Sequence, residues 1–408
     1  MSFESGRVAF TRFAVSGSGA SGGLPGRVDA GLLERLGEHA FEASGVPSLE
    51  APEVGFTTGR HLLDTAFTYE SCGFGGDSGL LRAAVRVDTH KVPGDLKKAY
   101  REIHQQAAAA ENPSGFATRA QKADAKDLAD RQVKDELASG RFRKSKATEL
   151  LWDLRKQELY VASTSTTLIE QVSRLMKGAF GAQLQVLSSG AVAGRVVKAS
   201  GRSRDWEDLH PSAFTKPPAD GGDVGEGPDG QLPPVPWLSK ATDLKDFLGS
   251  EFLLWLWHRT ESRDGGGVIE IDGGECAVVM VQGLDLECAW GMTGKVSVRS
   301  DQPTRGPEAR DALRMGKWPR KASLIVSDGE SQFELTLTAD SLAVSGCRLP
   351  DVVDAQSPRE LLDARLELVV DLGALLEGVF GVFLAERMGS GWGRKREAVA
   401  GWIRSGMG

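Results

Sequence analysis

The feature of this sequence that most constrains its fold is a charged helical segment inserted into a strand-rich region. Apolar residues recur at helical spacing over 96–111, and a second helical pattern covers 117–138 after a break at 112–115. The first stripe consists of Leu96, Ala99, Tyr100, Ile103 and Ala107. The second helix has few apolar residues. It must either project into water or be completed by a partner, because burial of one stripe supplies most helical stability.

Strand signals flank this segment on both sides. Residues 81–87 are typical of a strand, and residues 148–163 indicate a return to the sheet. We therefore predict a helical tip insertion over 91–147. The flanking segments, 1–90 and 148–210, are expected to form a central mixed α+β region.

The second half of the chain indicates another α+β unit, a base covering 243–408. It is preceded by a segment with seven Pro and five Gly over 211–236, a composition that buries too little apolar surface to order itself. We predict a linker over 211–242. The base should contain an apolar helix over 243–258 that carries tryptophans, hairpins, and a long helix over 361–388.

Global composition narrows the possible classes of protein only a little. The net charge is −7, from 49 Lys plus Arg against 56 Asp plus Glu, so the chain is not a uniformly basic coat for nucleic acid. The cysteines form no CxxC pair and are expected to be reduced core residues; they are Cys72, Cys276, Cys288 and Cys347. No leader or bilayer-length apolar run is recognised, so we expect a cytoplasmic protein without a membrane partner.

Motifs for catalysis are missing from the sequence. It contains neither GxSxG nor HExxH. Asp205, Glu207, Asp208 and His210 could be read as a nuclease cluster, but adjacent residues point in different directions, and a solvated loop is the simpler interpretation. We predict a protein that is not an enzyme and needs no cofactor or metal. A metal-dependent nuclease, or another enzyme that processes nucleic acid, stays open as the alternative.

Positive charge is concentrated in the predicted insertion and the strand after it. Residues 91–160 hold 15 Lys or Arg against 11 Asp or Glu, and the remainder of the chain is net negative. Arg119, Lys122 and Lys126 fall at i, i+3 and i+7, on one face of the second predicted helix. Basic stripes of this kind suit phosphate backbones, although a salt-bridged, solvent-exposed helix pair would carry the same charges. The candidate DNA-binding residues are Arg119, Lys122, Lys126, Arg141, Arg143, Lys144 and Lys146, with Lys317, Arg320 and Lys321 as a second cluster.

Several short motifs occur in a set order along the chain. In the first half they are Phe10-Thr11-Arg12-Phe13, Gly55-Phe56, Leu80 to Lys91 followed by Val92-Pro93, Val133-Lys134-Asp135-Glu136 and Leu150-Leu151-Trp152. In the second half they are Gly294-Lys295-Val296, Gln302, Gly316-Lys317 and Asp371-Leu372-Gly373-Ala374-Leu375-Leu376. As an ordered set they resemble the RdgC family of recombination-associated DNA-binding proteins.

Two features depart from the family pattern. The segment over 211–236 and the helix with Trp255 and Trp257 are added or enlarged here. Ser300-Asp301 stands where family members can carry a lysine pair just before the glutamine.

The resemblance implies a subunit made of a central region, a helical tip and a base, with two subunits meeting through tip and base to form a ring around duplex DNA. It implies a homodimer of the nucleoid that binds double-stranded DNA without sequence preference and restrains RecA-type strand exchange in recombination or replication. It also implies a dimer interface that includes Phe142, at the position of the tip-contact phenylalanine, and Gln302 in the base.

Overall fold

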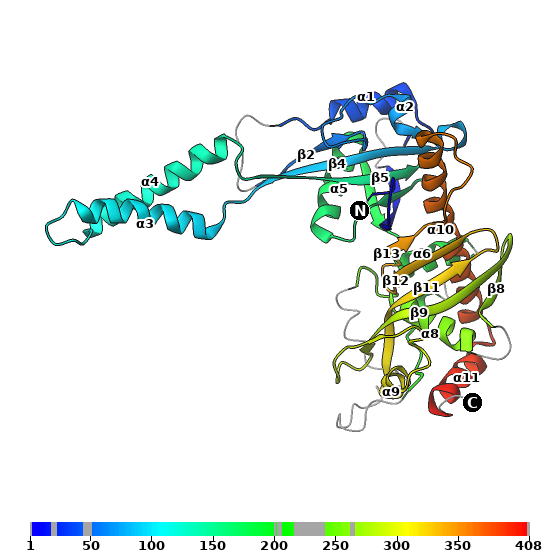
Figure 1. Ribbon diagram of the computed structural model, residues 1–408. Helices are drawn as coiled ribbons and strands as arrows, with labels where there is room; N and C mark the ends of the chain where they lie inside the picture. The colour runs from blue at the N-terminus through cyan, green and yellow to red at the C-terminus, as the bar shows by residue number, and fades with distance from the viewer. Residues whose placement is uncertain are drawn as a thin grey trace.

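The computed structural model confirms the α+β class (Figure 1). The residues that it describes are 2–17, 23–43, 51–199, 201, 206–215, 241–261 and 266–405. We name three parts: the upper half (2–90 and 143–186), the arm (91–142) and the lower half (187–405). Most of the predicted linker, 216–240, lies outside the described residues.

The upper half holds a set of antiparallel strands with short helices against them. Its strands are β1 (Val8–Gly17), β2 (Glu53–Thr57), β3 (Gly73–Phe74), β4 (Leu80–His90), β5 (Arg143–Asp153), β6 (Glu158–Val161) and β7 (Ala182–Val186). Its helices are α1 (Ala30–Glu38), α2 (Tyr69–Cys72), the short η1 (Gly76–Ser78) and α5 (Thr166–Phe180).

The lower half holds a second antiparallel set. Its strands are β8 (Val268–Ile271), β9 (Gly274–Cys288), β10 (Val296–Arg299), β11 (Lys317–Ser327), β12 (Gln332–Thr338) and β13 (Val344–Arg348). Its helices are α6 (Ser189–Ala199), α8 (Phe247–Glu261), α9 (Pro307–Arg314), α10 (Pro358–Arg387) and α11 (Trp392–Ser405). The apolar helix predicted over 243–258 therefore lies slightly later, at α8.

Strand β1 joins the two sets into one path, β10-β9-β11-β12-β13-β1-β6-β5-β4-β2. Val8 and Phe10 pair with β13, whereas residues 11–14 pair with β6. The first six residues of β1 are all buried, because elements cover the strand on both faces and the usual alternation is lost. The two halves are thus covalently and structurally continuous at β1.

Helix α8 forms the centre of the lower core. Every residue from Phe247 to Trp257 is buried, as expected for a helix that is apolar on all sides. A Cβ at Gly249 would lie 1.7 Å from the carbonyl oxygen of Ala339. The glycine therefore lets the helix approach the backbone of the sheet closely, and the predicted tryptophans are core residues.

Helix α10 connects both halves (Figure 1). Arg365 Nε donates to the carbonyl of Phe3 at 3.0 Å, and Glu377 accepts from Arg12 at 3.0 Å. By length and hydropathy alone α10 could cross a membrane, yet half of its apolar window is buried inside the protein. Core packing accounts for that share of its apolar residues, so its hydropathy is weak evidence of a span.

The arm extends from the upper half on a ribbon formed by β4 and β5, as the left-hand part of Figure 1 shows. It consists of two antiparallel helices, α3 (Gly94–Ala110) and α4 (Arg119–Ala138), close to the two helices predicted. Residues 187–215, by contrast, were assigned to the central region and linker, yet Leu187, Val192 and Phe214 belong to the lower core.

Candidate nucleic-acid interface

The arm is held together by a narrow seam between its two helices. Helix α4 buries four residues at i+4 steps, whereas α3 buries none; they are Ala125, Ala129, Val133 and Leu137. Polar contacts complete the seam: Tyr100 Oη donates to Glu136 Oε1 at 2.6 Å, and His104 lies 3.3 Å from Gln132. The narrow apolar stripe of α4 is therefore covered by α3 of the same chain.

A capping box fixes the beginning of α4. The Thr118 hydroxyl accepts from the backbone N–H of Gln121, and the Gln121 side chain accepts from the backbone N–H of Thr118. This motif satisfies donors that the first helical turn leaves unpaired. It sets the phase of α4 and so the direction in which its charged residues point.

Basic residues gather on one flank of the arm. Arg119, Lys122 and Lys126 are all exposed and share one flank of α4. In an antiparallel hairpin the matching flank of α3 carries Lys97 and Arg101, also exposed. Across the described residues, none of these five side chains has an ion pair or a hydrogen bond. The flank therefore presents uncompensated positive charge.

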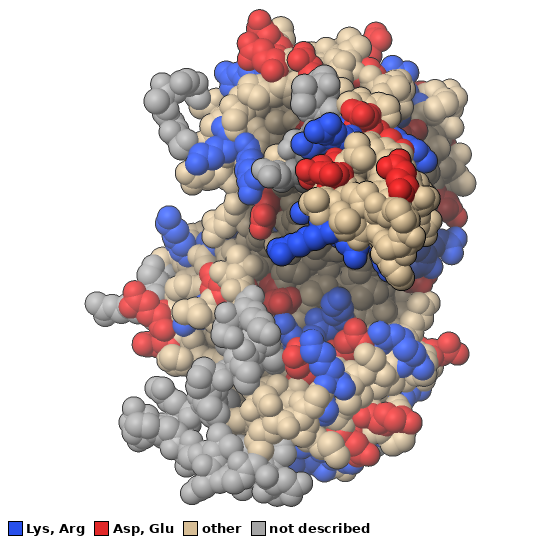
Figure 2. Space-filling view, turned by 90° about the vertical axis from the view of Figure 1, so that its left-hand side faces the viewer, with Lys and Arg blue, Asp and Glu red and all other residues tan. Residues whose placement is uncertain are grey.

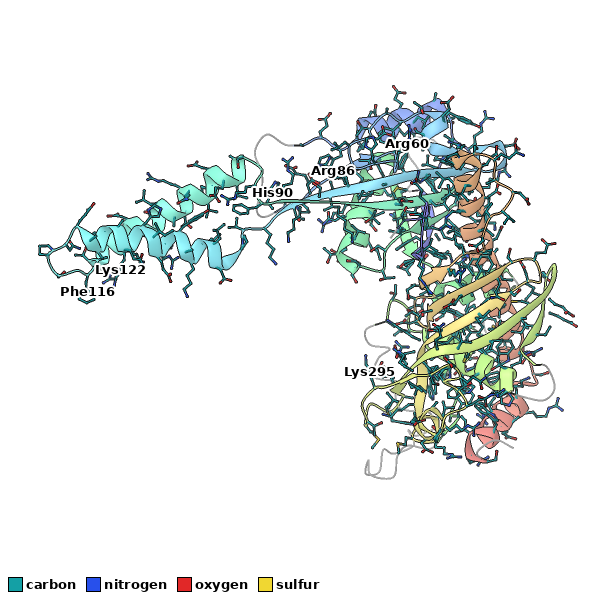
Figure 3. The ribbon with its side chains drawn as sticks, viewed as in Figure 1. Arg60, Arg86, His90, Phe116, Lys122 and Lys295 are labelled. Carbon is teal, nitrogen blue, oxygen red and sulfur yellow. The ribbon has the colours of Figure 1, made fainter. Side chains whose placement is uncertain are left out.

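This flank faces a recess between the arm and the lower half. Figure 2 shows Lys and Arg side chains along the lower side of the arm, with more of them across the recess. Figure 3 shows Lys122 pointing from the end of the arm toward the side on which the lower half lies. Lys295 lies at the edge of the lower half on that side, its side chain 76% exposed. Basic groups therefore occupy both walls of the recess.

Only the second part of the basic segment 141–146 is a strand: Arg143 to Lys146 begin β5, whereas Arg141 and Phe142 lie in the turn before it. Residues of a strand point alternately to its two faces, so Arg143 lies on one face and Lys144 and Lys146 on the other. Arg143 Nε is 3.8 Å from Asp88 Oδ2, and Arg141 Nη1 is 2.7 Å from Glu136 Oε1. The four cations do not form one cluster.

An ion-pair network anchors the ribbon where the arm begins. Both Arg86 and Arg143 face Asp88, which is fully buried, and Arg86 Nη2 donates to its Oδ2 at 2.7 Å. Burial alone would raise the pKa of Asp88, but hydrogen bonds from Arg86 and Ser145 outweigh it and keep that pKa below its usual value. Arg86 and Arg143 therefore position the ribbon.

The second predicted cluster is largely structural. Lys317 is only 6% exposed and its Nζ donates to the Gly294 carbonyl at 2.6 Å, so the prediction that it reaches DNA is wrong. Arg320 is 15% exposed and lies 3.0 Å from Asp340 Oδ2, so the accessible role predicted for it is also wrong. Lys321, by contrast, is exposed.

The aromatic residue at the end of the arm is Phe116, not Phe142. Phe142 is half-buried where the arm joins the ribbon, and its carbonyl accepts from Lys91 N. Phe116 lies in the turn between α3 and α4 and is 78% exposed (Figure 3). The tip position predicted for Phe142 is wrong. An apolar residue directly after the Asn-Pro-Ser-Gly break was the signal that could have identified Phe116.

Gln302 lies in the turn before α9. It is exposed, and its backbone carbonyl accepts from the N–H of Arg305 at 3.1 Å. This position is accessible to a second subunit. Its role in a dimer interface stays a prediction.

Groups suited to catalysis are scattered in the described part of the chain. No cluster of three or more His, Cys, Asp or Glu that could hold a metal occurs among the described residues. Glu207, Asp208 and His210 are exposed, and Asp205 lies outside the described residues. All four cysteines are buried and unpaired, as predicted. Burial raises the thiol pKa to about 11 in Cys276 and about 12 in Cys347, which makes them poor nucleophiles.

Comparisons with known proteins do not identify a family. A scan against protein-family models found no match, and a search of curated proteins found no matching relative. The resemblance to the RdgC family therefore stays a prediction from the sequence motifs.

Proposed function

We propose that this protein binds double-stranded DNA without sequence preference and is not an enzyme. It acts as a ring-shaped homodimer of the nucleoid that encircles DNA and modulates homologous recombination or replication by restraining RecA-type strand exchange. The observation that carries this proposal is the basic flank of the arm, whose cations face a recess and lack partners across the described chain. The resemblance to the RdgC family adds the ring and the pathway.

Backbone recognition fits these groups better than base readout. Long, flexible Lys and Arg side chains along a helix flank neutralise phosphates, whatever the sequence of the duplex. The five exposed side chains of the arm flank are all Lys or Arg, and none is an Asn or Gln that could read base edges. The exposed residues thus suit a charged, uniform ligand.

A second copy would close the recess. The arm projects from only one side of the molecule (Figure 1), so one subunit can flank a duplex but not surround it. Phe116 at the end of the arm and Gln302 in the lower half are both exposed, so the arm end and the lower half can each contact a second subunit. Pairing at both places would produce a closed, two-fold ring.

The decisive experiment is a mobility shift of a random duplex across a salt series. Each phosphate contact should contribute a slope of about −0.9 in log K against log salt. The double charge reversal Lys122→Glu with Lys126→Glu should weaken binding and flatten that slope. The matched control, Arg131→Glu with Lys134→Glu, makes the same charge change at exposed positions of α4 outside the basic flank and should have a smaller effect.

Other results would reject the proposal. Equal losses in both double variants would mean that only net charge matters, and affinity independent of salt would exclude backbone binding. Incubation of supercoiled DNA with Mg²⁺ or Mn²⁺ should leave it uncut, since cleavage would favour a nuclease. Light scattering should give twice the 43.6 kDa monomer mass; a monomer at micromolar concentration would exclude the ring.

A further inference from the structure

A polar pocket lies on the outward face of the lower sheet, away from α8. Four neighbouring strands contribute to it, β9, β10, β11 and β12. Its volume is about 210 Å³, and it is lined by Gln282, Gly283, Asp285, Arg299, Lys321, Ser323 and Thr336. Nothing in the function proposed above assigns a role to this pocket.

A local irregularity of the sheet creates the pocket. The register between β9 and β11 shifts between Ala322 and Leu324, and Gln282 has a φ of +56°, which is rare for a residue other than glycine. Bulges of this kind redirect side chains and are frequent beside functional sites. A Cβ at Gly283 would lie 3.2 Å from Ser323 Oγ, so a larger residue would fill the floor.

The pocket is lined by hydrogen-bond donors. Lys321 is exposed, and within the described chain its Nζ has no hydrogen bond or ion pair. Arg299 keeps a 60% exposed side chain while its Nη2 pairs with Asp285 at 2.7 Å. The hydroxyls of Ser323 and Thr336 lie 2.9 Å apart. Only one of these two can donate to the other, so the second proton is free for a ligand.

Charge selects the class of ligand. Burial would raise the pKa of Asp285, but hydrogen bonds from Ser297 and Arg299 outweigh it and hold that pKa below its usual value, so the carboxylate is ionised. Arg299 compensates that negative charge, which leaves the ammonium of Lys321 as the excess charge of the pocket. A cation would be repelled, whereas an anion with several oxygens can accept from the ammonium, the guanidinium and a hydroxyl together.

The geometry points to a phosphate-binding pocket at Lys321, Arg299 and Ser323. The phosphate can come from two sources: the backbone of a bound duplex or a free phosphorylated small molecule. Lys295, at the start of the segment that leads to Arg299, lies on the side of the recess (Figure 3). The first source rests on the proposed function, and the second is independent of it.

The test uses two probes on the full-length protein. Pyrophosphate binding is measured by calorimetry and binding of a short random duplex by fluorescence anisotropy. Lys321→Ala should weaken pyrophosphate binding about tenfold or more, since a hydrogen bond to a charged group is lost. Asp285→Asn should strengthen it, because the competing negative charge is removed. Lys198→Ala, which removes an exposed cation on α6, a helix packed against α8, should leave pyrophosphate binding unchanged.

The outcomes separate this proposal from the proposed function. If Lys321→Ala weakens both probes, the pocket holds a backbone phosphate, and if it weakens pyrophosphate alone, the pocket serves a free phosphorylated compound. If wild type binds pyrophosphate but no duplex, the proposed function fails and the pocket stands. The pocket is rejected if pyrophosphate does not bind, or if Lys198→Ala is as harmful to its binding as Lys321→Ala. The proposed phosphate pocket would also be rejected if it bound a cation more tightly than pyrophosphate.

Discussion

The arm flank and the core of the lower half hold arginine and lysine side chains in opposite surroundings. In the arm, Arg101 and Lys122 are exposed and have no ion pair within the described chain. In the lower half, Arg387 pairs with Glu251 inside the core and Lys317 is buried against a backbone carbonyl. This difference shows that a run of basic residues in the sequence does not by itself identify a binding surface. The partner available to each cation decides its role.

The largest effect is expected from removal of the buried cation. Arg387 Nε donates to Glu251 Oε2 at 2.6 Å, and these side chains are 8% and 0% exposed. Arg387→Ala should reduce the free energy of unfolding by about 3–5 kcal/mol, because it leaves a buried carboxylate without its partner. Urea denaturation measures this loss. Arg101→Ala in the arm should change stability by less than about 0.5 kcal/mol, and equal losses would overturn the comparison.

A matched pair of leucine truncations should sharpen the contrast next. Leu253 is fully buried in α8, and Leu137 is 5% exposed in the seam of the arm. Both changes to Ala remove the same atoms and should reduce the free energy of unfolding by roughly 2–5 kcal/mol. The cost of Leu137→Ala should be the smaller one, because the helical hairpin of the arm can relax around the shorter side chain. We expect Leu253→Ala to lower protection from hydrogen exchange throughout the lower half. Leu137→Ala should lower protection only in the arm. If Leu137→Ala lowered protection throughout the protein, the arm would not be a separate unit.

The anchor of the arm should respond to pH. The pKa of Asp88 lies below its usual value because Arg86 and Ser145 donate to it. The stabilisation that ionised Asp88 gives the folded state is therefore fully present above the pKa of an unfolded aspartate, about 4. It is lost as the pH falls through the lower pKa of Asp88 in the folded state. Asp88→Asn should cost about 1.5–3 kcal/mol at neutral pH and flatten the acid limb of the stability curve. The exposed Asp95→Asn serves as the control, and an unchanged acid limb in Asp88→Asn would contradict this assignment.

The smallest effect is expected for an ion pair on the surface of the arm. Lys98 Nζ lies 3.9 Å from Glu102 Oε1, and the two side chains are 75% and 57% exposed. Lys98→Ala should change the free energy of unfolding by no more than about 0.5 kcal/mol, since solvent screens such pairs. Thermal unfolding at low and high salt checks this. A larger loss would mean that the arm depends on its exposed charges for folding.

Sequence periodicity predicted several elements of the fold. The arm helices, the β4 and β5 strands, and the long helix α10 follow from apolar spacing and from turn residues, both of which are local signals. The predicted helical face of Arg119, Lys122 and Lys126 was correct for the same reason. Lys97 and Arg101 could also have been found, since they are four residues apart on the first predicted helix.

The errors arise where partners are distant in the chain. Burial of Lys317 depends on Gly294, and the pairing of Arg320 depends on Asp340; no local pattern reports either contact. Residues 143–146 were placed in the helical insertion because their charge obscured the strand, and only the register with β4 separates Arg143 from Lys144. The phosphate pocket likewise combines four strands and a bulge, which periodicity alone does not reveal.

The ribbon that carries the arm also determines how such a molecule can vary in size. Strands β4 and β5 pair without a bulge from Leu80 and Asp153 to His90 and Arg143. Lengthening each strand by one residue would reverse the pleat and turn the arm over, so that its cations faced outward. Lengthening each by two residues would preserve the facing and move the arm outward by about 7 Å. Related chains with wider or narrower openings should therefore differ here in even steps.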